Sequence, residues 1–138
     1  MRFARGNPFV RFLLALGLGV SAVADTPQAM LQANGVVRVN GTNVPSSRAV
    51  FSGDKIQTTT TSTGTLTQPG TSVSLNPNTT VTHQSQALDL ESGSLAVHTS
   101  RGQGVRGHLM WVHPLHDGSA DYQVTRAGCW LEVSVAQG

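Results

Sequence analysis

Short runs in which apolar and polar residues alternate recur along the chain from Val36 onward. Alternation of this kind predicts β-strands that bury one face and leave the other face in water. Residues that favour turns, mainly Gly, Asn, Asp and Pro, separate the runs. The clearest runs are residues 36–39, 55–60, 71–75, 79–83, 88–90, 95–97, 122–125 and 130–135.

The spacing of the turns predicts an all-β fold of short antiparallel strands. A turn signal recurs every six to nine residues over much of the chain, which is tighter than the roughly 8–12 residues typical of an immunoglobulin-like sandwich. A compact sandwich and a solenoid-like stack of small β-layers both remain open. We interpret Glu91-Ser92-Gly93 as one of the turns, and residues 27–33 as the only plausible helical segment after the N-terminal region.

Residues 1–24 have the pattern of a secretory signal peptide. Arg2, Arg5 and Arg11 precede an apolar run over residues 12–20, and Ala22-Val23-Ala24 follows as a cleavage site. The run is too short to span a bilayer as a helix, although an uncleaved N-terminal anchor is the alternative. We therefore predict a cleaved signal at 1–24, a short leader at 25–35 and one β-domain at 36–138, with no transmembrane helix in the mature chain.

Removal of the signal changes the charge of the protein. Three of the nine Lys and Arg residues lie in residues 1–24, together with none of the seven Asp and Glu residues, so the mature chain carries a formal charge of −1. Nucleic-acid binding requires clustered cations, and the mature chain offers none. We expect no nucleic-acid partner.

Cys129 is the only cysteine. A single cysteine forms no intramolecular disulfide, although an exported one can pair between chains. No signature of a thiol enzyme surrounds it, so we expect a small, partly buried apolar side chain.

Residues 50–58 contain a Gly-Asp-x-Ile-x-Thr element formed by Gly53, Asp54, Ile56 and Thr58, and an ordered series of elements continues through Gly70 and Gly93. This series resembles the FecR-type periplasmic domain. The resemblance covers residues 36–101 well and extends loosely to 138. It implies an exported signalling or scaffold domain without catalytic residues. The cytoplasmic region with which family members bind sigma factors has no counterpart in the sequence.

The same residues have a physical interpretation. Gly53 can adopt the positive φ that a tight turn needs, and Asp54 can accept a hydrogen bond from a following backbone N–H. Ile56 is expected to point into the core, whereas Thr58 is expected to be hydrated or to pair across strands. The motif predicts local folding rather than chemistry.

Two patterns suggest ligand chemistry. Gly102, Gly104 and Gly107 spell G-x-G-x-x-G, but no helical pattern follows, so we interpret residues 102–107 as a flexible loop and expect no cofactor. His108, His113 and His116 form a weak candidate metal site beside Asp117. His108 and His113 differ by an odd number and would face opposite sides of a strand, so exposed histidines are the preferred interpretation and no metal is expected.

The sequence predicts a protein that is not an enzyme. No Ser lies in G-x-S-x-G, and no base and orienting residue can be recognised for a nucleophile. The leading hypothesis is an exported envelope domain, periplasmic, at the cell surface or secreted, that binds another protein or its own copies through a strand edge or loop face. The final run, residues 132–135, would leave its edge unpaired, as if a further strand followed.

The alternative hypothesis is a carbohydrate- or peptidoglycan-binding module. Such a module needs exposed aromatic side chains as stacking surfaces. The candidates are Trp111, Tyr122 and Trp130, and two of them lie in core-like runs.

Overall fold

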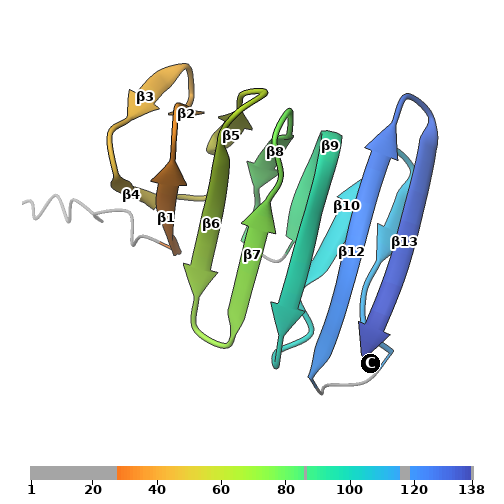
Figure 1. Ribbon diagram of the computed structural model, residues 1–138. Coiled ribbons are helices and arrows are strands. Elements are labelled where there is room, and N and C mark those ends of the chain that lie inside the picture. The colour runs from red at the N-terminus through yellow and green to blue at the C-terminus, as the bar shows by residue number, and fades with distance from the viewer. Residues whose placement is uncertain (1–27, 86, 116–118, 138) are drawn as a thin grey trace, which may run out of the picture.

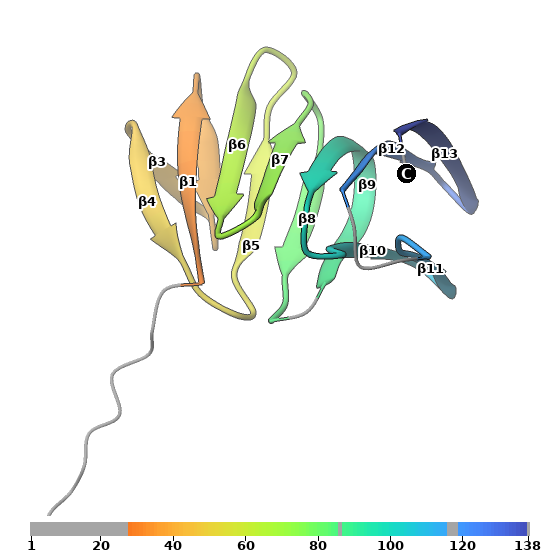
Figure 2. The ribbon, with the colours of Figure 1, turned by 90° about the horizontal axis from the view of Figure 1, so that it is seen from below.

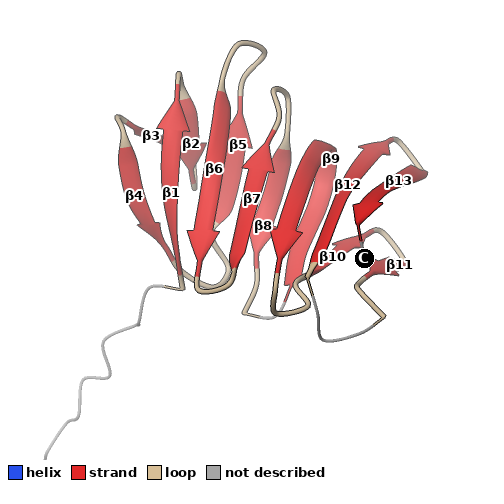
Figure 3. Ribbon diagram, turned by 60° about the horizontal axis from the view of Figure 1, so that its bottom comes forward, coloured by secondary structure: helices blue, strands red, loops and turns tan. Residues whose placement is uncertain are grey.

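The computed structural model describes residues 28–85, 87–115 and 119–137, which form only strands and the turns between them (Figure 3). The all-β fold predicted from the alternating pattern is confirmed. Within these ranges no helix has the length and apolar character that crossing a bilayer requires. The strands are β1 (Ala29–Asn34), β2 (Val37–Val39), β3 (Thr42–Val44), β4 (Ser47–Val50), β5 (Lys55–Thr58), β6 (Thr63–Gln68), β7 (Thr71–Leu75), β8 (Thr80–His83), β9 (Ala87–Thr99), β10 (Gly104–Gly107), β11 (Met110–Val112), β12 (Ala120–Ala127) and β13 (Trp130–Gln137).

The strands form two facing layers (Figures 1 and 2). The first layer has the order β4-β1-β6-β7-β9-β12-β13, and the second has the order β3-β2-β5-β8-β9-β10-β11. Adjacent strands are antiparallel except β10, which is parallel to β9. Of the two arrangements left open by the sequence, the sandwich describes this pairing, because two layers share one core between them.

Strand β9 belongs to both layers. Its first half pairs with β8 and β10, and its second half pairs with β7 and β12. The interpretation of Glu91-Ser92-Gly93 as a turn between two strands was therefore wrong, because the chain stays extended through all three residues. Gly93 has a φ of +91°, and this single left-handed residue redirects the strand from one layer to the other without ending it.

The core lies between the layers and is built from alternate residues of each strand. Leu31, Leu66 and Val73 of the first layer, and Ile56 and Val81 of the second, are each at most 2% exposed. The intervening Thr, Ser and Gln residues line the outer surfaces, because successive side chains of a strand point to opposite faces. The polar composition of the chain is thus compatible with a continuous apolar core.

The first strand lies earlier in the chain than the sequence predicted. Residues 29–34 form β1, which pairs with β4 on one side and β6 on the other. Neither a leader at 25–35 nor a helix at 27–33 describes this segment. Its Ala, Met, Leu and Gln residues favour helices intrinsically, but pairing on both edges and complete burial of Leu31 outweigh that preference.

The glycine-rich stretch also differs from its prediction. Gly104–Gly107 forms β10 rather than a flexible loop, and Val105 of this strand is fully buried. A Cβ atom on Gly104 would lie 3.0 Å from the Trp111 ring, so the neighbouring strand approaches closely there. A two-residue turn and β11 follow, and no helix follows the last glycine to hold a pyrophosphate.

Candidate functional site

The Gly-Asp-x-Ile-x-Thr motif forms a turn and the strand after it. Gly53 has a φ of +93°. Oδ2 of Asp54 accepts a hydrogen bond from the N–H of Phe51 at 2.9 Å, and the Asp54 N–H donates to the Phe51 carbonyl at 3.1 Å. The expectation that Asp54 would bond a following N–H was wrong, since its carboxylate closes the turn back onto the preceding residues. Oδ1 accepts a further bond from the Asn40 amide at 2.9 Å.

The other motif residues are also structural. Ile56 is fully buried, as predicted. Thr58 is only 8% exposed rather than hydrated; its hydroxyl donates to the Asn76 carbonyl at 2.7 Å and accepts from the Thr79 N–H at 2.9 Å. Gly70 occupies the β6–β7 turn with a φ of +76°, where a Cβ atom would lie 2.6 Å from Cγ of Arg101.

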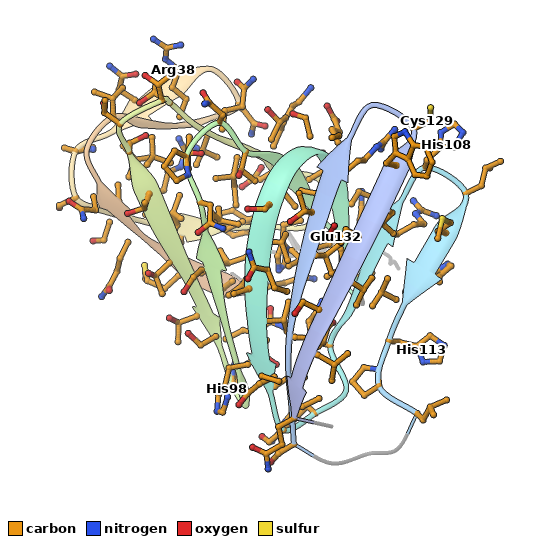
Figure 4. All side chains as sticks on the ribbon, turned by 45° about the vertical axis from the view of Figure 1, so that its right-hand side comes forward. Arg38, His98, His108, His113, Cys129 and Glu132 are labelled. Atoms are coloured by element: carbon orange, nitrogen blue, oxygen red, sulfur yellow. The ribbon has the colours of Figure 1, made fainter. Side chains whose placement is uncertain are left out.

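The structure separates the candidate metal ligands. His108 lies in the β10–β11 turn, whereas His113 follows the other end of β11 (Figure 4). His113 Nδ1 lies 3.0 Å from the carbonyl oxygen of Pro114. His116 lies outside the described residues. Among the residues that are described, no three His, Cys, Asp or Glu side chains gather as a metal site would require.

A buried polar chain crosses the sandwich beside β8. His83 is 1% exposed, and its Nε2 lies 3.2 Å from the Gln68 side-chain oxygen. The Gln68 amide donates to the side-chain oxygen of Gln103 at 2.7 Å, and the hydroxyl of Tyr122 donates to the Gln103 backbone carbonyl. Nδ1 of His83 has no hydrogen-bond partner.

Burial shifts the pKa of two of these groups. It lowers the pKa of His83, because a charged imidazolium would lose its hydration; the negative charge of Asp54 and the nearby backbone of Phe51 oppose this in part. Burial raises the pKa of Tyr122 to about 12. Both groups are therefore held neutral at physiological pH, and this chain of contacts joins the layers rather than supplying charge.

A polar groove runs over the outer face of the first layer. Ser72, His98 and Asp121 lie at directly opposed positions of β7, β9 and β12, and they line a groove of about 390 Å³ with Ser74, Gln123 and Ser134. The Asp121 carboxylate contacts Nδ1 of His98. The sequence showed no such pair, because the registers of three strands bring the residues together.

This groove holds an oriented histidine without an activated nucleophile. Among the described residues no hydrogen bond joins Ser72 to His98, and a nucleophilic serine needs a base within hydrogen-bond reach. The His98 side chain is 71% exposed. The groove is therefore a weaker candidate than the surface at the open end of the sandwich.

An apolar surface lies open between β11 and β13, the last strands of the two layers. Val133 and Val135 are paired with Val124 and Tyr122, which are buried, so all four side chains point between the layers. However, Val133 is 39% exposed and Val135 is 62% exposed. Together with Val112, Pro114 and Leu115 they line a groove of about 190 Å³. The core thus reaches the edge of the molecule without a strand to cover it in the described part of the chain.

The two layers touch at one end of this opening. A Cβ atom on Gly107 would lie 2.8 Å from Cδ1 of Leu131, so β10 and β13 pack closely there. Toward the C-terminal end of β13 the layers diverge, as Figure 4 shows from the side of the opening. The exposed apolar side chains therefore lie in a wedge that widens along β13.

The aromatic residues do not form a shared platform. Tyr122 is buried, whereas Trp111 is 54% exposed and Trp130 is 79% exposed. Trp111 is paired with the exposed Arg106 of β10 and so faces outward from the second layer. Trp130 lies on the outer face of the first layer by alternation with Leu131. The two indoles thus belong to outer surfaces of different layers.

Cys129 lies in the β12–β13 turn and is exposed (Figure 4). The expectation of a partly buried side chain was wrong, because a two-residue turn at the end of a hairpin directs its side chains into solvent. The expectation rested on the absence of a thiol-enzyme signature around Cys129, which carries no information about its exposure.

Three comparisons with known proteins complete the description of the site. No family model matches the chain, and no curated protein or solved structure matches it.

Proposed function

We propose that this protein is a non-catalytic, exported β-domain that binds protein partners by strand addition at the edge formed by β13. One observation carries the proposal: the inner face of β13 presents Val133 and Val135 at an edge that has no neighbouring strand in the described residues. Unpaired N–H and C=O groups at such an edge bind an incoming strand, and alternate side chains supply the specificity. The added strand would cover the apolar wedge.

The FecR-type resemblance supports the same reading, as does the signal-like N-terminus. Both point to the envelope of a bacterium, as a periplasmic, cell-surface or secreted protein, where a scaffold or signalling domain acts through protein contacts. The sandwich supplies a rigid frame for that contact. No step of the proposal requires a cofactor or a metal.

Carbohydrate or peptidoglycan binding is the weaker alternative. Sugar-binding surfaces stack aromatic rings against a saccharide, and here Trp111 and Trp130 face away from each other on different layers. A single exposed indole offers a saccharide only a small stacking surface. The open wedge offers an incoming strand a larger apolar surface.

Site-specific photocrosslinking in the expressing bacterium tests the proposal. A photoreactive side chain at position 135 should crosslink to a defined protein, which includes a second copy of this chain. The matched control carries the same group at position 38, on the exposed face of β2 at the opposite end of the sandwich. Equal crosslinking from both positions, or binding to purified cell-wall sacculi with no protein captured at position 135, would overturn the proposal.

A further inference from the structure

The β13 edge has few of the features that normally keep an edge strand single. Edge strands are protected by Lys, Pro, bulges or covering loops. β13 contains neither Lys nor Pro between residues 130 and 137, and Glu132 is its only charged residue. Its single register shift, opposite Asp121 and Tyr122, falls near the C-terminal end. At the other end of the sandwich, by contrast, Pro45 and Ser46 connect β3 directly to β4 across the layers.

The residues of β13 are self-complementary in one antiparallel register. When a second β13 is placed with Val133 opposite its own symmetry mate, Leu131 faces Val135 and Glu132 faces Ser134. Each pair then joins two odd-numbered or two even-numbered residues. The apolar inner residues of one copy therefore lie opposite the apolar inner residues of the other. For the same reason, residues whose N–H and C=O groups point away from β12 lie opposite residues of the same orientation in the other copy. These backbone groups alternate in direction along an antiparallel strand.

The charges of the strand permit this register. Like charges at directly opposed positions would destabilise the pair of strands. Here the only carboxylate on each strand faces a hydroxyl. The two Glu132 side chains are diagonal neighbours, roughly 7–8 Å apart in such a ladder. Their repulsion is weak and screened by salt.

A second copy also completes the core. Each copy brings an unpaired edge together with the partly exposed Val133 and Val135, and a two-fold axis sets both stripes on the same side of the joined sheet. An unrelated partner strand would have to supply a matching apolar stripe of its own. Isologous two-fold contacts are the commonest way in which soluble proteins associate.

Resting on the proposed strand addition, we propose that the partner is a second copy of this chain, bound through antiparallel β13–β13 pairing about a two-fold axis at Val133. The joined layer continues from β12 of one copy to β12 of the other. The apolar wedge of each copy closes against that of its mate.

Sedimentation of the full chain, purified after export, measures the association. We expect a reversible dimer whose dissociation constant rises at least tenfold in Val133→Lys. The control Ser74→Lys places the same charge on the outer face of β7, away from the edge, and should leave the dimer unchanged. A monomer at all concentrations, with a different protein crosslinked at position 135, would overturn the self-pairing and leave strand addition standing. A monomer without any crosslink would overturn both.

A cysteine pair fixes the register independently of whether Val133→Lys folds. In a Cys129→Ser background, Val133→Cys places two thiols on the axis with Cα atoms about 5.5 Å apart, within the range of a disulfide. Mild oxidation should then convert the protein to a covalent dimer. The control Ala136→Cys faces Trp130 of the other copy and should stay monomeric under denaturing conditions. Equal dimer from both variants, or dimer only from the control, would overturn the register.

Discussion

A Cβ atom on Gly93 would lie 2.5 Å from the carbonyl oxygen of Asn78. The same atom would lie 2.5 Å from the hydroxyl of Thr79, so the β7–β8 turn packs directly against the point where β9 changes layer. Gly93 thus combines a positive φ with an approach that only a residue without a side chain permits.

Gly93→Ala should therefore destabilise the fold strongly. The left-handed conformation and the contact with backbone atoms act together, and we expect a loss of about 3 kcal/mol or more in the free energy of unfolding. Gly41→Ala is the matched control, since Gly41 has a φ of +82° with no atom within 4 Å of the added Cβ; it should lose only about 1–2 kcal/mol. Urea unfolding measures both, and equal losses would contradict the packing argument.

The assignment of β1 to the sandwich predicts a large effect of Leu31→Ala. Leu31 is fully buried between the layers, so its truncation should cost about 2–5 kcal/mol. Met30, the next residue, is 46% exposed on the opposite face, and Met30→Ala should change stability by less than about 1 kcal/mol. Thermal or urea unfolding compares them. Similar stabilities of the two variants would indicate that residues 29–34 form a peripheral leader rather than a strand of the core.

His83 should make the protein acid-sensitive. Its pKa is lowered in the folded state, so the unfolded chain takes up the proton first. The stability that neutral His83 provides is complete above about pH 6.5, the unfolded value, and is lost as the pH falls from there through the folded pKa. The slope from one such group approaches at most about 1.4 kcal/mol per pH unit.

His83→Gln isolates that contribution. The variant removes the titrating group, so the difference in unfolding free energy between wild type and variant should shrink as the pH falls from about 7 to 5. His113→Gln is the control, because the His113 side chain is exposed and contacts the Pro114 carbonyl rather than a carboxylate. A wild-type minus His83→Gln difference that stays constant over this range would contradict the buried neutral imidazole.

Tyr122 is the only tyrosine, so its ionisation can be followed without interference. Burial raises its pKa to about 12, and its hydroxyl donates to the Gln103 carbonyl. In alkaline titration the tyrosinate absorbance of the folded protein should therefore appear about two pH units later than in urea, where the pKa is about 10. A folded protein that titrates near pH 10 would show an accessible hydroxyl.

Strands such as β5, β7 and β8 could be predicted because their signals are local. Ile56, Val73 and Val81 alternate with polar neighbours, and the structure buries all three. The same local reasoning failed at Gly93, where Glu-Ser-Gly resembles a turn although the strand continues. It failed at β1 as well, because a helix-favouring composition was read without knowledge of the two strands that pair with it.

The candidate site depended on long-range order that no local pattern contains. An unpaired edge after residues 132–135 was expected from the sequence, but exposure of Val133 and Val135 follows from the position of β11 and β12 around them. The closeness of His98 to Asp121 likewise arises from the register of β9 against β12. Residues 108 and 113 looked adjacent along the chain and were separated by a strand.

Membership of β9 in both layers has a consequence for how the protein opens. Since Leu90 pairs in one layer and Leu95 in the other, neither layer can separate from its partner without disturbing the same strand. Backbone amides of β9 should exchange with solvent only through global unfolding, as one cooperative unit. During folding, moreover, β9 can pair with both layers only once the whole of residues 87–99 is available to β8 and β7.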